Sequence, residues 1–171
     1  SELEEDKKRI EETLRRLEET AKEYHRRSRE ELRRLEEEAK RYHEESKETL
    51  DRLRRENITS EELRDTIRRL EDRNKKLLEK LKKDIDEHKR RNEELMRRLR
   101  KTIEDLKREL DKGPDDKKLK DIKEEVERVM KKLEDLVRRD NEESEKVLEK
   151  LKRLVERNNE DIKRALEELR K

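Results

Sequence analysis

The sequence contains no Cys, Trp or Phe, and it has one Gly, one Pro and two Tyr among 171 residues. Without Cys there is no disulfide framework, no thiolate nucleophile and no Cys-based zinc or iron–sulfur site. A single Gly cannot build a phosphate-binding loop, and a mixed α/β domain needs more turn residues than this chain has. Apolar runs never exceed two residues, so we expect neither a transmembrane span nor a signal-peptide core.

Charged residues make up 62% of the chain, yet the two signs nearly cancel. There are 54 Lys and Arg against 52 Asp and Glu, which gives a net charge of +2. Disorder by composition requires high net charge as well as low hydrophobicity, and only the second condition is met. The most basic stretch, residues 89–101, is interrupted by Glu93 and Glu94 and has no aromatic residue nearby. Because a nucleic-acid surface gathers cations of one sign, often with aromatics, we predict no nucleic-acid partner.

The first break in the charged pattern is Asn57-Ile58-Thr59-Ser60. With Thr59 as the N-cap, Glu62 falls at the third helical position and completes a capping box. Ile58 and Leu63 then occupy the two positions of a hydrophobic staple. This segment therefore predicts a short loop followed by a new helix.

The second break is Gly113-Pro114, followed by two aspartates. Glycine suits the left-handed residue that follows a helix, and proline cannot continue that helix. Acidic residues favour the next helix N-terminus, and Ser1 with Glu4 repeats the capping-box pattern at the first residues. Almost all other residues are good helix formers. The chain is predicted to form helices at about 2–56, 60–112 and 115–171, with loops at 57–59 and 113–114.

Inward-facing residues recur at a step of 18 residues along each helix. Leu63, Leu81 and Leu99 show this step in the second helix, as do Leu133 and Leu151 in the third. Eighteen residues make five turns of 3.6 residues, whereas a heptad repeat forces a left-handed supercoil. Short connections make sequential helices antiparallel neighbours. We therefore predict an all-α, antiparallel, up-down-up three-helix bundle of long, nearly straight helices, with a single domain spanning residues 1–171.

Polar residues interrupt the apolar stripes at matching heights. Facing residues of an antiparallel pair have a constant sum of residue numbers. The first loop predicts a sum near 117 and the Tyr/Asn pairs give 116, whereas the second loop predicts about 227 and the Asn/Asp and Asn/Asn pairs give 232. The first predicted layer contains Tyr24, Ser28, His88, Asn92 and Asp140, with Ser144 as a further candidate. The second contains Tyr42, Ser46, Asn74 and Asn158. His25 and His43 lie at the edge of the stripe, beside their tyrosines.

These layers permit a catalytic, a metal-binding or a structural interpretation. A Ser, a His and an Asp on one level superficially resemble a nucleophilic triad, but a triad needs an exposed nucleophile, an oxyanion hole and a cleft. Di-metal bundles need inward Glu-x-x-His pairs, and Lys22, Lys40 and Ile85 precede the three histidines instead. We therefore predict no enzyme activity, no catalytic residues, no metal and no cofactor. Buried hydrogen-bond networks that fix helix register are the favoured interpretation.

The pH response of the first layer is left open by the sequence. A buried neutral His88 would have to take up charge below its pKa, which would strain the layer on acidification. Asp140 on the same level would instead stabilise the cation.

At this point the chain resembles computationally designed, parametric helical bundles with buried hydrogen-bond networks. The resemblance rests on the 18-residue repeat, the Glu/Lys/Arg surface, the two capping loops and the polar layers, and it covers the whole chain. It is a likeness of sequence style, so no functional residue is carried over. It implies a stable scaffold with no natural substrate or compartment, which would be soluble and cytoplasmic in an expression host.

Two functions follow as hypotheses. The first is a structural scaffold whose polar layers specify helix pairing, with no partner required and no membrane contact. The alternative is a component of a designed assembly, either a homo-oligomer or a three-helix acceptor for a partner helix. The wide apolar stripe of the third helix, with doublets such as Leu136-Val137 and Leu154-Val155, motivates this alternative because it either closes on the other helices or leaves a groove.

Overall fold

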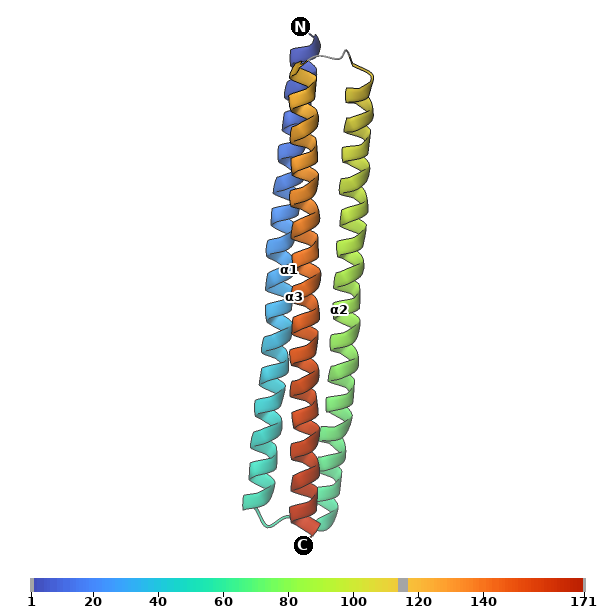
Figure 1. Ribbon diagram of the computed structural model, residues 1–171. Helices are drawn as coiled ribbons and strands as arrows, with labels where there is room; N and C mark the ends of the chain where they lie inside the picture. The colour runs from blue at the N-terminus through green and yellow to red at the C-terminus, as the bar shows by residue number, and fades with distance from the viewer. Residues whose placement is uncertain (1, 114–116, 171) are drawn as a thin grey trace. The chain divides into compact units, whose positions relative to one another are not determined.

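The computed structural model describes residues 2–113 and 117–170, and of these nearly all are helical. The helices are α1 (Glu2–Arg55), α2 (Ser60–Asp111) and α3 (Lys117–Arg170) (Figure 1). Their ends lie within one residue of the predicted ones wherever the predicted ends are described. The predicted cap at Ser1 and the predicted start of the third helix at residues 115–116 lie outside the described residues. No strand occurs in the described part of the chain, so the all-α fold is confirmed.

The loop before α2 has the Thr59 half of the predicted capping box. The Glu62 amide donates to Thr59 Oγ1 at 3.2 Å, and the Leu63 amide donates to the Thr59 carbonyl at 3.1 Å. Ile58 and Leu63 are both half-buried and pack against the same apolar cluster. The cap and the staple therefore fix where α2 begins, because they satisfy an otherwise free amide and anchor the entering chain.

The prediction of a left-handed Gly113 is wrong, since no described residue, glycine included, has a positive φ. The Gly113 amide instead donates to the Leu110 carbonyl at 3.2 Å, which closes a final tight turn. A Cβ added at Gly113 would lie 3.0 Å from Leu119 Cδ1. Glycine is suited to this position by the close approach of Leu119 rather than by its backbone freedom.

The described residues group into two compact units, and each helix contributes one segment to each unit. Unit 1 comprises Ser1–Glu30 and His88–Glu143, and unit 2 comprises Glu31–Glu87 and Ser144–Lys171. Unit 1 has one apolar cluster, which includes Leu14, Ile103 and Leu133. Unit 2 has two, one around Leu81 and Leu151 and the other around the loop-proximal residues. The single domain predicted over residues 1–171 stays a prediction.

Ion pairs give the helix directions within each unit. In unit 1, Arg9 of α1 contacts Glu109 of α2 at 3.1 Å, and in unit 2 Lys80 of α2 contacts Glu38 of α1 at 2.7 Å. Both pairs have residue numbers that add to 118, so α1 and α2 are antiparallel. Pairs between α1 and α3 have a constant difference of 114 or 115 residues, so those two helices are parallel. The up-down-up bundle is confirmed.

The register between α2 and α3 follows the polar layers and not the loop. Arg100 lies 3.8 Å from Glu134 in unit 1, a pair whose residue numbers add to 234. Asn92 and Asn141 add to 233. The sum near 227 that the loop suggested is therefore wrong, and the 232 obtained from the layers is within two of the observed values.

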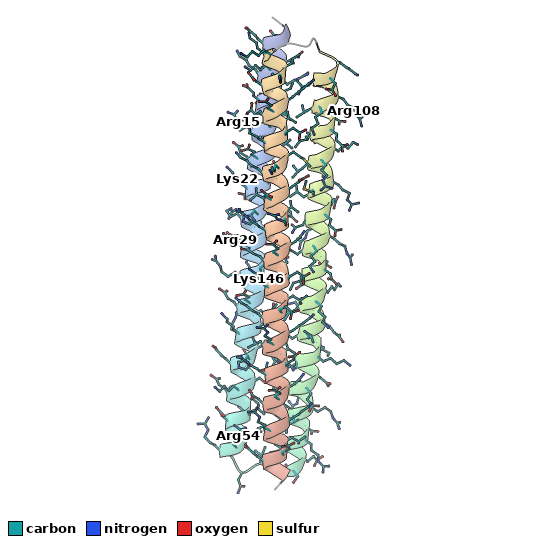
Figure 2. All side chains as sticks on the ribbon, in the orientation of Figure 1. Arg15, Lys22, Arg29, Arg54, Arg108 and Lys146 are labelled. Carbon is teal, nitrogen blue, oxygen red and sulfur yellow. The ribbon has the colours of Figure 1, made fainter. Side chains whose placement is uncertain are left out.

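Charged side chains cover the outside of all three helices (Figure 2). Arg15, Lys22 and Arg108 are exposed examples. Many of these side chains form pairs three or four residues apart, such as Arg26 with Glu30 at 2.7 Å. No large hydrophobic side chain is exposed in the described part. None of the helices, over those same residues, is long and apolar enough to span a membrane.

Candidate functional site

The nine predicted layer residues lie almost entirely inside the two units. Eight of them are buried, and Tyr24 is half-buried. Asn92 has no exposed surface, and His88 and Asn74 are each 1% exposed. Buried polar side chains are costly unless they form hydrogen bonds, so the partners of each side chain decide what the layers do. Ser144 is also fully buried, but it belongs to unit 2 whereas the rest of the first layer belongs to unit 1.

The unit 1 layer is centred on Asp140 of α3. His25 Nδ1 of α1 donates a hydrogen bond to Asp140 Oδ1, and the Asp140 side chain is 3% exposed against 20% for His25. Asn92 Nδ2 of α2 donates to Asn141 Oδ1 at 3.1 Å. Consecutive residues on α3 therefore accept hydrogen bonds from the two other helices.

Burial raises the pKa of the Asp140 carboxyl above its ordinary value, because the ionised form loses its hydration. Attraction to His25, the hydrogen bond from His25 and attraction to His88 oppose this rise in the pKa, while Glu143 on the next turn adds to it. At the rim Arg29 Nη2 binds Glu143 Oε1 at 3.1 Å, so the charge of Glu143 has its own counter-ion.

The unit 2 layer has the same frame but neutral acceptors. His43 Nδ1 of α1 donates to Asn158 Oδ1 of α3. Asn74 Nδ2 of α2 donates to the Val155 carbonyl at 3.1 Å and to Asn159 Oδ1 at 2.5 Å. Each of these bonds joins two helices, so the amide of Asn74 ties α2 to α3 as Asn92 does in unit 1.

Tyr42 of α1 contacts two residues of α2 in the unit 2 layer. Its hydroxyl donates to the Leu70 carbonyl at 2.9 Å, and the guanidinium of Arg73 lies 5.0 Å from the ring centroid. Burial raises the pKa of Tyr42, although the charge of Arg73 opposes the rise. The phenol therefore stays protonated and donates throughout the physiological pH range.

The two layers repeat at the sequence interval predicted for the helices. His25 and Asp140 are 115 residues apart, as are His43 and Asn158. Asn92 with Asn141 and Asn74 with Asn159 repeat the α2–α3 contact at the same 18-residue step. The same side-chain contacts between helices therefore recur in both units.

Sequence reasoning placed His25 and His43 at the stripe edge and missed Asn141 and Asn159. The 18-residue repeat could have identified them, because Asn141 and Asn159 are 18 residues apart and each directly follows a predicted layer residue. A helical residue next to an inward position lies about 100° away, so only a long or polar side chain can turn back toward the core.

Three buried oxygen atoms have no hydrogen-bond partner within the described residues: Ser46 Oγ, Asn74 Oδ1 and Asn92 Oδ1. A buried acceptor left without a partner costs about 1–3 kcal/mol. The layers therefore do not stabilise the protein as strongly as apolar side chains would at the same positions.

The layers offer little to a substrate or a metal ion. Ser28, His88 and Asp140 are each at most 3% exposed, and Asp140 accepts its hydrogen bond from His25. Such a serine cannot act as an accessible nucleophile. No group of three or more His, Cys, Asp or Glu side chains among the described residues could hold a metal ion.

No protein-family model matches the chain, and no curated protein does. Among solved structures, the chain is similar to one described as a computationally designed three helix bundle. The match has 21% sequence identity and a TM-score of 0.45, and it covers 97% of this chain and 88% of that one.

Proposed function

We propose that the chain is a designed structural scaffold without a natural biochemical activity, and that its buried polar layers specify which helix faces pair and in which register. The observation that carries this proposal is the repetition of the same interhelical contacts, His25 with Asp140 and His43 with Asn158, at a spacing of 115 residues. Apolar stripes alone tolerate sliding, because one leucine replaces another at little cost. Buried amides do not, because a slip removes their partners.

The proposal predicts that removing a layer loosens register without lowering stability. Asn74→Leu removes the α2–α3 amide contact of unit 2 and replaces it with apolar packing, so the free energy of unfolding should stay equal or rise by about 1 kcal/mol. Because the chain has no Cys, spin labels can be attached through Glu71→Cys and Glu160→Cys, two exposed positions in unit 2. Electron–electron distance measurements should then give a broader distribution for Asn74→Leu than for the parent.

Asn92→Leu is the matched control, since it makes the same change in unit 1. It should leave the distance distribution of the unit 2 label pair as narrow as in the parent. The proposal fails if Asn74→Leu gives an equally narrow distribution. It also fails if that variant loses much of its helical circular dichroism, because the amide would then stabilise the fold itself.

A second candidate is an acceptor for a partner helix or for a second copy, which is motivated by the wide apolar stripe of α3, with doublets such as Leu136-Val137 and Leu154-Val155. Against it, the wide stripe of α3 is covered within the units: Val137 and Leu148 are buried and Leu136 and Leu154 half-buried.

The absolute mass in solution separates the two candidates. Light scattering on a size-exclusion column over a hundredfold concentration range should give a constant mass near 21.4 kDa for the self-contained scaffold. A mass that rises to a multiple of this value would favour the assembly component.

A further inference from the structure

The unit 1 layer holds a cluster of titratable side chains that unit 2 lacks. Asp140 is the only acidic side chain that is buried among the described residues, and His88 is the only buried basic one. Moving back 18 residues from His88 leads to Leu70, and moving forward 18 from Asp140 leads to Asn158. The charged cluster of unit 1 therefore corresponds to a neutral amide and a leucine in unit 2.

The charged and titratable groups that face Asp140 come from all three helices. They are His25 and Arg29 from α1, His88 from α2 and Glu143 from α3 itself. Arg29 and Glu143 bind each other at the exposed rim, so their charges largely cancel. The Asp140 carboxyl therefore remains as the buried acidic group of the unit, with the two imidazoles beside it.

We propose that the Asp140 carboxyl, buried between His25 of α1 and His88 of α2, is a proton-binding site that makes unit 1 more stable relative to unit 2 when the solution is acidified from neutral pH. Burial of an ionised carboxyl destabilises its surroundings, because the charge loses its hydration. Uptake of one proton by the carboxyl removes that cost. The His43–Asn158 contact in unit 2 contains no carboxyl and gains nothing comparable.

The sign follows from linkage between protonation and folding. The pKa of Asp140 is raised in the folded protein above the ordinary pKa of an Asp side chain. Between that ordinary value and the raised one, the folded unit therefore binds more protons than the unfolded chain does. Stability from this source is fully present below the ordinary pKa and is lost as the pH rises through the raised pKa.

The test compares the parent with a variant of identical composition, Asp140→Asn/Asn158→Asp, which moves the carboxyl from unit 1 to unit 2. Native-state hydrogen exchange measured by mass spectrometry, corrected for intrinsic rates at each pH, gives a protection factor for the segments of each unit. In the parent, the ratio of unit 1 to unit 2 protection should rise as the pH falls from 7 to 4, by about tenfold for each unit by which folding raises the pKa of Asp140. In the exchanged variant the ratio should fall instead.

Asp140→Asn alone is the second variant, and it gives unit 1 the amide that unit 2 already carries. It should be better protected than the parent at pH 7 and should lose the pH dependence of the ratio. A ratio in the parent that does not change with pH would overturn the proposal. So would a pH dependence that persists unchanged in Asp140→Asn, because the histidines alone would then be responsible.

Discussion

His25 in unit 1 and His43 in unit 2 make the same contact with α3, but one imidazole meets a carboxyl and the other an amide. The surroundings of the two imidazoles are otherwise the same. The same pair of helices, the 115-residue spacing and an asparagine directly after the acceptor residue occur in both units. The comparison shows that the position of a buried hydrogen bond and its charge are separate choices. We propose that the position of the bond fixes the register of the helices and that its charge governs the dependence of stability on pH.

The apolar clusters differ as well. Unit 1 has one continuous cluster, whereas unit 2 has two that flank its polar layer. Leu133 and Leu151 are related by the 18-residue step and are 0% and 2% exposed. The two leucines therefore occupy equivalent positions, one in the single apolar cluster of unit 1 and the other in one of the two clusters of unit 2.

The largest expected effect comes from truncating these two leucines. Leu133→Ala and Leu151→Ala should each lower the free energy of unfolding by about 2–5 kcal/mol, because each leaves a cavity in a packed core. If the two units are equivalent in packing, the two losses measured by guanidinium denaturation agree within about 1 kcal/mol. A much larger loss for Leu133→Ala would show that the continuous cluster of unit 1 carries more of the stability.

A smaller effect separates the two imidazoles. His25→Leu should lower the free energy of unfolding at pH 7 by about 1–2 kcal/mol more than His43→Leu, because bonds to charged groups are about twice as strong as neutral ones. The substitution is the same in both, so most of the packing change cancels. Chemical denaturation at pH 7 measures the difference, and equal losses would mean that Asp140 is not ionised in the folded state.

Most of the fold could be predicted from the sequence because its signals are local. Thr59 and Glu62 mark a helix start through neighbouring residues, and the 18-residue step marks the inward face. Burial of Asn92 and Asp140 follows from that step, since they lie on the apolar stripe.

The partners within the layers could not be predicted in the same way. The bond from His25 to Asp140 depends on side-chain reach across a helix interface, which residue spacing does not encode. The prediction of a left-handed conformation at Gly113 was also wrong. What the structure shows there instead is the close approach of Leu119, a tertiary contact that the neighbouring residues do not reveal. The α2–α3 register also departs from the loop estimate of about 227, since the observed pairs have residue numbers that add to 233 and 234.

The two ends of the units provide the smallest expected effects. The loop in unit 2 depends on a side-chain cap, and Thr59→Ala should lower the free energy of unfolding by about 1 kcal/mol, because the Glu62 amide loses its acceptor.

Gly113 in unit 1 has no positive φ, so Gly113→Ala requires only a small movement of the flexible Leu119 side chain. Its effect should remain within about 0.5 kcal/mol of zero, since reduced freedom of the unfolded chain offsets the closer contact. Thermal or guanidinium unfolding of both variants measures these differences. A loss above about 1 kcal/mol for Gly113→Ala would mean that Leu119 cannot move, and that the end of unit 1 is packed more rigidly than the capped loop of unit 2.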